Sequence, residues 1–378
     1  MRAQRPFRFA VVLQTPKDPH SAVYLTYQTL ATALERLGHS VEIVSPNDFA
    51  VLRGVSGRWV PLLYPLAIAG WMHRRRRAFD VVMFHSYAGW LATALRRAPW
   101  PRALVMFHGV EPLYFRELQE EANAHGQPLS WRYRLLQERL MPFMLRTACR
   151  TADAVTCLNR AEAGVISAWK WVPSDRLEIL AHGVPPEFFV EARPMRPVRT
   201  MLFVGQWLPM KGIRYLRDAA VTLLQADPSM RLVCAGTLAP EQSVRSDFPT
   251  ELQPRVAVMP RVEPGALAEQ YRDADVFVFP SLYEAFSRAI VEAMAARLAV
   301  VTTAVGVAAD ALRDEENALI VPKRSAAAIV AAVRRLQRDT ALAVRLGGAA
   351  AATAAEYRLD DVEQRTVSVV LRLAGDVS

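Results

Sequence analysis

The chain has 378 residues, of which 52% are hydrophobic, so it is long enough for two or three domains with buried cores. Its three cysteines (Cys149, Cys157 and Cys234) have neither a metal-binding nor a redox spacing, and scattered thiols of this kind favour the reducing cytoplasm. No run reaches the roughly 18–20 apolar residues of a membrane-spanning helix, and the short apolar run 7–13 favours a first strand over a secretion signal. We therefore expect a cytoplasmic protein, either soluble or peripheral on the inner face of a membrane.

The net charge of +9 is unevenly distributed along the chain. Residues 1–195 hold 24 Lys and Arg against 16 Asp and Glu, a net +8, whereas the remainder holds 22 against 21, a net +1. Seven of the eight tryptophans also lie in the first part. This asymmetry favours an acidic, amphiphilic or membrane-bound partner for the first half, and we expect no nucleic-acid partner.

The first half alternates predicted strands with predicted helices. Apolar runs predict strands at 7–13, 41–44, 80–84, 103–107, 154–158 and 177–180, and periodic segments predict helices at 22–37, 131–151 and 160–170. Pro142 should kink or restart the second of these helices. The polar stretch 111–130 predicts an irregular loop suited to an acceptor.

An apolar segment, 60–72, is followed by His73 and by four arginines, residues 74–77. A core helix would place these cations at its C-terminal end, where the helix dipole favours them. An interfacial helix would instead direct the arginines to anionic lipid. The sequence leaves both interpretations open, and Pro61 and Pro65 should confine any helix to the later part of the segment.

The second half repeats the alternation after a proline-containing linker. Strands are predicted at 201–204, 232–235, 256–259, 276–279 and 299–303, with helices between them and at 325–337 and 340–355, and a final amphipathic stretch at 359–373. We expect a first domain over 1–193, a second over 199–357, and a tail helix over 358–378 that packs back on the first.

The stretch 276–303 has the order strand, loop, helix, strand of a parallel crossover. Glu284 lies on the loop, Ser287 is expected to cap a helix of about three turns that ends near Arg297, and Glu292 lies inside this helix. In parallel sheets, ligands bind where strands end and helices begin, and a helix N-terminus suits a phosphate. Carboxylates beside a phosphate site suit hydroxyls, so the pattern predicts a nucleotide sugar.

A second loop of this kind, residues 205–212, follows the strand at 201–204. Gly205 at the strand end allows the backbone to approach a ligand closely. Lys211, at the start of the next helix, supplies a point charge for a phosphate.

These motifs resemble those of the family 4 retaining glycosyltransferases. Glu284 and Glu292 are similar to the family's Glu-x7-Glu signature, which usually begins Glu-Gly-Phe-Gly where this chain has Ala285, Phe286 and Ser287. The pair Lys211-Gly212 is similar to the family's phosphate motif, in which an arginine stands at the position of Gln206. His108-Gly109 resembles the family's His-Gly pair.

The resemblance implies an α/β protein of the GT-B fold, with two Rossmann-like doubly wound domains facing across a cleft and a C-terminal helix that crosses back to the first. It implies an acceptor site in the first domain, a nucleoside-diphosphate sugar in the second, retention of anomeric configuration, no metal, and no cofactor beyond this co-substrate. The acceptor would be a glycan or a lipid-linked molecule, and an anionic membrane surface could meet the first domain.

The resemblance also implies roles for individual residues. The catalytic residues would be His108, Lys211 and Glu284. Donor contacts would come from Gly205, Gln206, Lys211, Glu284, Ala285, Phe286, Ser287 and Glu292.

Three other functions are open from the sequence. A nucleotide-sugar epimerase can share the fold, but should have several acid–base groups in its cleft. A non-catalytic nucleotide-sugar binder is favoured by Gln206 and by a first loop, residues 16–21, that contains no glycine. A two-domain solute-binding protein would need an export signal, which the predicted first strand disfavours.

Overall fold

The computed structural model describes residues 5–18, 21–57 and 59–375, so Pro19 and His20 of the first loop lie outside the described residues. By packing, the chain divides into two compact units. The first unit runs through Phe115, resumes over Leu129–Ala181, and ends with the segment that begins at Val362. The second unit comprises Arg116–Pro128 and His182–Asp361. Each unit is described by itself.

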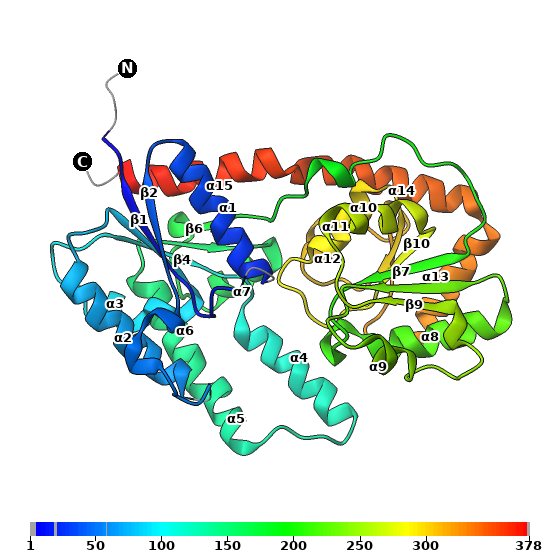
Figure 1. The fold of residues 1–378 in the computed structure, drawn as a ribbon, viewed down its shortest axis with the longest axis horizontal. Coiled ribbons are helices and arrows are strands. Elements are labelled where there is room, and N and C mark those ends of the chain that lie inside the picture. Colours follow the sequence, from blue (N-terminus) through cyan, green and yellow to red (C-terminus); the bar gives the residue numbers. More distant parts are fainter. Residues whose placement is uncertain (1–4, 19–20, 58, 376–378) are drawn as a thin grey trace. The chain divides into compact units, whose positions relative to one another are not determined.

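The first unit contains a parallel sheet with helices on both faces (Figure 1). The strand order is β2-β1-β3-β4-β5-β6, with β1 (Arg8–Val12), β2 (Ser40–Val44), β3 (Val81–His85), β4 (Arg102–Met106), β5 (Ala154–Cys157) and β6 (Leu177–Ile179). One face packs on α1 (Ala22–Arg36) and on the part of α15 (Leu359–Gly375) that belongs to this unit, through Tyr27 and Val370 among others. The other face packs on α2 (Val60–Arg75), α3 (Trp90–Ala94), α6 (Met141–Thr151) and α7 (Arg160–Ala168).

The second unit contains another parallel six-stranded sheet, in the order β12-β11-β10-β7-β8-β9. Its strands are β7 (Thr200–Val204), β8 (Arg231–Ala235), β9 (Val256–Met259), β10 (Val276–Phe279), β11 (Ala299–Thr302) and β12 (Leu319–Ile320). Its helices are α8 (Ile213–Ala226), α9 (Glu241–Arg245), α10 (Pro264–Asp273), α11 (Arg288–Ala295), α12 (Val307–Ala311), α13 (Ala326–Arg338) and α14 (Thr340–Ala354). The two doubly wound sheets confirm the predicted fold class.

The stretch predicted to be an irregular acceptor loop is instead largely helical, so that prediction is wrong. Helix α4 spans Glu111–Ala124, and the chain leaves it through Gly126 and Pro128. Glu, Leu, Gln and Ala favour helix even where no apolar stripe is evident, and Pro112 is tolerated because the first turn needs no N–H from it.

The prolines of the apolar segment do not confine its helix, which is a second correction. Helix α2 begins at Val60, with Pro61 in its first turn and Pro65 in its interior. Burial of Tyr64, Ile68 and Met72 stabilises the helix despite the hydrogen bond that Pro65 cannot donate.

At Pro142, where a kink or restart is predicted, the structure shows a change of helix type without a break, since the backbone stays helical through Leu140 and Met141. A short helix, α5 (Trp131–Leu135), passes into a π-helical turn over Leu136–Leu140, and α6 begins at Met141 with Pro142 in its first turn. Within the described ranges, no helix is both long and apolar enough to cross a bilayer.

Candidate active site

The second sheet changes its winding direction between the neighbouring strands β7 and β10. The chain continues from β7 to β8 and β9 on one side, and from β10 to β11 and β12 on the other. In open α/β sheets, the loops that leave two such strands diverge and form a ligand-binding crevice. Here these loops are residues 205–212 after β7 and residues 280–287 after β10.

The two loops are held together by a close backbone contact that requires glycine. Gly212 has a φ of +71°, and a Cβ added to it would lie 1.9 Å from the carbonyl oxygen of Pro280. The carbonyl of Met210 accepts a hydrogen bond from the backbone N–H of Leu282 (2.9 Å). Any larger residue at position 212 would separate the loops.

Lys211 and Glu284 meet across these loops. The Lys211 Nζ lies 2.7 Å from Glu284 Oε1, which also accepts a 2.7 Å hydrogen bond from the Ser281 hydroxyl. The Glu284 side chain is only 8% exposed, and the lysine ammonium lies 5.7 Å from the centre of the Phe279 ring. The structure thus brings together two of the three predicted catalytic residues, with a partly exposed cation available to an anionic ligand.

The loop residues that follow Glu284 pack closely against the turn after β11. A Cβ added to Gly306 would lie 2.6 Å from the carbonyl oxygen of Phe286, and this carbonyl accepts a hydrogen bond from Val307 N–H (2.8 Å). The contact positions Ala285, Phe286 and Ser287 beside the Lys211–Glu284 pair. Gly205 and the exposed Gln206 lead out of β7 into the other loop.

Ser287 does not cap the following helix through its side chain, contrary to the prediction. It precedes α11 with a φ of +73°, and its hydroxyl makes no capping hydrogen bond. Helix α11 has 8 residues, fewer than the three turns expected, but it closes near Arg297 as predicted, with Ala296 as its C-cap and Arg297 at a φ of +57°. With this left-handed backbone, the Ser287 hydroxyl is buried and has no hydrogen-bond partner among the described residues.

Glu292 lies in α11 and is buried. It accepts a 2.9 Å hydrogen bond from the Tyr271 hydroxyl and lies 3.8 Å from Arg288 Nε, one turn earlier in the same helix. Burial raises the pKa of Glu292, and the Arg288 charge opposes this shift. Its contact with a donor ribose stays a prediction.

His108 belongs to the first unit and follows β4. Its ring makes edge contacts with Tyr27 (5.0 Å between centroids) and with His85 at the end of β3 (5.2 Å). Burial lowers the pKa of His108 to about 4 and that of His85 to about 3. Both imidazoles are therefore neutral at physiological pH, so His108 can exchange hydrogen bonds with a ligand but brings no positive charge.

The sequence analysis missed Glu111, which begins α4 three residues after His108. The hydroxyl of Ser86, a residue with a φ of +52°, donates a hydrogen bond to Glu111 Oε1. Glu111 Oε2 is buried without a hydrogen-bond partner among the described residues. Burial raises the pKa of Glu111 to about 7, and the Ser86 hydrogen bond lowers it only in part. Its position in the His108-Gly-Val-Glu111 run after a strand could have identified it.

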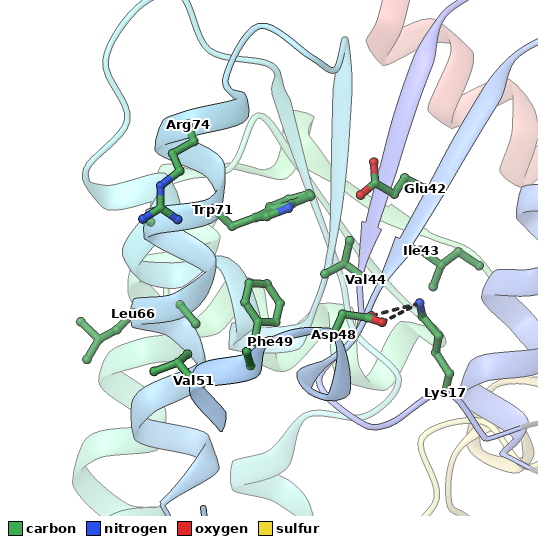
Figure 2. A pocket seen from close by; sticks show the side chains of 13 residues that line it. Lys17, Glu42, Ile43, Val44, Asp48, Phe49, Val51, Leu66, Trp71 and Arg74 are labelled. Atoms are coloured by element: carbon green, nitrogen blue, oxygen red, sulfur yellow. Dashed lines mark hydrogen bonds and ion pairs between the residues drawn. The ribbon is translucent and has the colours of Figure 1, made fainter. Parts of the chain in front are cut away.

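Away from these strand ends, the first unit has a cavity of about 760 Å³ between β2, α2 and the segment 48–51 (Figure 2). Figure 2 shows an apolar side formed by Phe49, Val51, Leu66 and Trp71, with Arg74 above it and a Lys17–Asp48 ion pair opposite. The cavity is therefore amphiphilic.

No group of three or more His, Cys, Asp or Glu side chains in the described part of the chain is arranged to hold a metal ion.

Comparison with known proteins defines the class of this chain. Residues 26–188 match the family model described as Glycosyltransferase Family 4, and residues 198–339 match the model described as Glycosyl transferases group 1. The chain belongs to family 4 of the glycosyltransferases and has the GT-B fold.

Among curated proteins, the chain is similar to D-inositol 3-phosphate glycosyltransferases. It is 33% identical to that of Thermomonospora curvata over 186 residues, which are 46% of this chain and 43% of the relative. It is 24% identical to that of Streptomyces bingchenggensis over 326 residues, 80% of this chain and 68% of the relative. The chain thus spans less than half of the first of these relatives.

Solved structures share the fold over nearly the whole chain. The sucrose-phosphate synthase of Thermosynechococcus elongatus has a TM-score of 0.78 at 20% identity, covering 98% of this chain and 100% of its own. The Anabaena HepE protein in complex with UDP-glucose has a TM-score of 0.67 at 15% identity, covering 97% and 99%.

We predict that Glu111→Gln raises the melting temperature more at pH 8 than at pH 5. Because the pKa of about 7 in the folded protein lies above the ordinary glutamate value of 4.5, the wild type loses stability as the pH rises through this interval. Glutamine cannot ionise, so the variant avoids a loss on the order of 2–3 kcal/mol. Thermal melts at both pH values test this, with Glu191→Gln as an exposed control. An equal change at pH 5 and pH 8 would show that Glu111 does not titrate within the fold.

Proposed function

We propose that this glycosyltransferase moves a sugar, with retention of anomeric configuration, from a nucleoside-diphosphate sugar to a glycan or lipid-linked acceptor. The observation that carries the proposal is the contact between Lys211 and Glu284, one from each loop at the switch point of the second sheet. A cation beside a carboxylate fits a ligand that joins a diphosphate to a sugar bearing hydroxyls.

Each partner in this contact would exchange its present bond for one to the donor. Lys211 would take up the diphosphate, whose charge grows as the bond to the sugar breaks. Glu284, still held by the Ser281 hydroxyl, would then accept hydrogen bonds from sugar hydroxyls. The backbone of residues 285–287 would line the sugar, Glu292 would hold the ribose, and the neutral His108 would be a hydrogen-bonding catalytic group from the first unit.

The names of similar proteins direct the choice of substrates. HepE was solved with UDP-glucose, so UDP-sugars are the first donors to test. The curated relatives are named for D-inositol 3-phosphate, which belongs in the acceptor panel beside lipid-linked and oligosaccharide acceptors.

The proposal is tested by incubating the protein with UDP- and GDP-sugars, with and without acceptor, and following the products by NMR. A new glycoside with the anomeric configuration of the donor is the expected product. Epimerised sugar without acceptor would identify an epimerase, and donor binding without turnover would identify the non-catalytic binder that Gln206 favours. We expect a chelator to leave turnover unchanged, because Lys211 would supply the charge beside the diphosphate.

We predict that Lys211→Ala lowers kcat by about 10²–10³ while donor affinity falls less, because the lysine is needed most as charge develops on the leaving diphosphate. Steady-state kinetics and donor titration separate the two effects. Lys323→Ala, which removes a lysine from the same unit outside the two loops, is the matched control. Activity within a few-fold of wild type would remove Lys211 from the site.

We predict opposite kinetic effects for the two glutamates. Glu284→Gln, next to the reacting sugar, should lower kcat, whereas Glu292→Gln should raise KM for the donor with little change in kcat, since a ribose contact is made equally before and during reaction. Glutamine at position 292 can still accept from Tyr271, so a melting curve should show that the fold is retained. Identical kinetics for both variants would contradict this division of roles.

We propose further that α2 holds the first unit on an anionic membrane, as a lipid-linked acceptor would require. Trp59, Leu63 and Leu66 are spaced by four and three residues and are 51%, 40% and 58% exposed, so they form one apolar face. Of the four arginines that follow, Arg75 pairs with Glu42 and contacts Trp71, whereas Arg74 and Arg77 are exposed. The exposed pair, at and just beyond the C-terminal end of α2, would meet lipid headgroups if this apolar face lay on a membrane.

We predict that the protein sediments with anionic vesicles at low salt and that salt releases it. Arg74→Gln with Arg77→Gln should weaken binding about 30-fold, at about 1 kcal/mol for each arginine, while transfer to a short soluble acceptor survives. Arg334→Gln with Arg338→Gln removes the same charge from α13 and serves as the control. Wild-type protein that stays in the supernatant would refute the membrane proposal.

A further inference from the structure

A second concave site lies in the first unit, outside the residues discussed so far. Its volume is about 550 Å³, within the range of about 300–1,000 Å³ that is usual for small-molecule sites. It is lined by the end of α6 and by the connection between α7 and β6. The lining contains three cations and no carboxylate: Arg150, Lys170 and Arg176.

Lys170 occupies a backbone position that favours glycine. Helix α7 ends at Ala168, and the N–H of Lys170 bonds the carbonyl of Ser167 (2.9 Å) while that of Trp171 bonds the carbonyl of Ile166 (3.3 Å). This is the hydrogen-bond pattern of a Schellman cap, whose left-handed residue is usually glycine. Lys170 adopts it with a φ of +53°. The conformational strain at a lysine here calls for a use of its side chain.

Other charged residues with a positive φ form hydrogen bonds or ion pairs with other groups of the protein through their side chains. Arg297 Nε donates to the carbonyl of Val190 (3.0 Å), Arg324 bonds Glu117 and Glu121, and Glu315 pairs with Arg335. In the described structure, the Lys170 ammonium has no hydrogen bond or ion pair, and neither has the Arg150 guanidinium. The strained residue therefore places an unpaired cation at a cavity that a second unpaired cation also lines.

The remaining residues at this site suit a carbohydrate. Trp171 lines the site but is only 7% exposed because it packs in the core of the unit, whereas Trp169, whose ring centroid lies 4.5 Å from that of Trp171, is 36% exposed. The hydroxyls of Ser167 and Ser174 also line the site. The Arg176 guanidinium donates a hydrogen bond to the carbonyl of Ala152 (3.3 Å), and this bond holds one of the three cations at the edge of the site. An exposed indole near hydroxyl partners fits a sugar ring, and cations that line the same site fit a carboxylate or phosphate on that sugar.

We propose that this groove binds an anionic carbohydrate, a sugar chain bearing carboxylate or phosphate groups, through Arg150 and Lys170. The choice of a carbohydrate rests on the proposed sugar transfer, since a growing glycan is the polymer that such an enzyme must hold. A concave site fits a chain that enters it, whereas a membrane surface would need an exposed, protruding face.

The experiment measures binding by calorimetry at about 150 mM salt, with no sugar donor present. The probes are a hexamer of galacturonic acid, maltohexaose as a neutral chain of the same length, and inorganic phosphate. We expect the acidic hexamer to bind and the other two to bind at least about tenfold more weakly. Equal binding of maltohexaose would overturn the role of the cations, and equal binding of phosphate, or a preference for anionic vesicles over the hexamer, would overturn the assignment to carbohydrate.

Two variants of one residue make the test specific. Lys170→Gly removes the charge and relieves the left-handed strain, so it should weaken binding about tenfold or more while the melting temperature stays equal or rises. Lys170→Arg keeps the charge and should bind within about threefold of wild type. Wild-type affinity in Lys170→Gly would overturn the proposal. Because binding needs no turnover, a protein that binds the hexamer but transfers no sugar would refute the proposed function alone.

Discussion

The contact of Gly212 with the carbonyl of Pro280 is the constraint on which the candidate active site depends. Two neighbouring parallel strands, β7 and β10, end side by side, and their loops can only touch if one of them carries no side chain at that point. With the loops in contact, a lysine and a glutamate that are 73 positions apart in the sequence come within 2.7 Å. The same arrangement leaves the lysine partly exposed, as a cation that must exchange partners during catalysis should be.

A second glycine makes a similar contact on the other side of the loop. Gly306 allows the backbone of Phe286 to approach, and α12 then holds the carbonyl of Phe286 through Val307. The segment from Glu284 to Ser287 is thereby fixed at both ends before any ligand arrives. Pre-ordered groups of this kind lose little conformational freedom on binding, which is how a site stabilises a short-lived transition state efficiently.

The positive charge of the first unit serves several purposes, although the sequence shows only a net excess of Lys and Arg over Asp and Glu. Asp153 pairs with Arg96 (2.7 Å) and Arg102 (3.3 Å), and Arg75 pairs with Glu42, so part of the excess supports the fold. At the strand ends, the neighbouring imidazoles of His85 and His108 are neutral because burial lowers their pKa. Among the described residues, cations without an ion pair include Arg74 in α2, and Arg150 and Lys170 beside the connection between α7 and β6.

The sequence by itself determined that the chain forms two alternating α/β units and that the motifs lie on loops that follow strands. Strand and helix periodicity depend on neighbouring residues, so Val276–Phe279 or α8 could be read locally, and Lys211 and Glu284 could be placed at strand ends. Tertiary packing decided the features that depend on distant residues. Burial of Ile68 and Met72 maintains α2 past Pro65, the backbone of Phe286 packs against Gly306, and burial raises the pKa of Glu111. Each of these depends on which atoms surround a residue in space, and no local pattern carries that information.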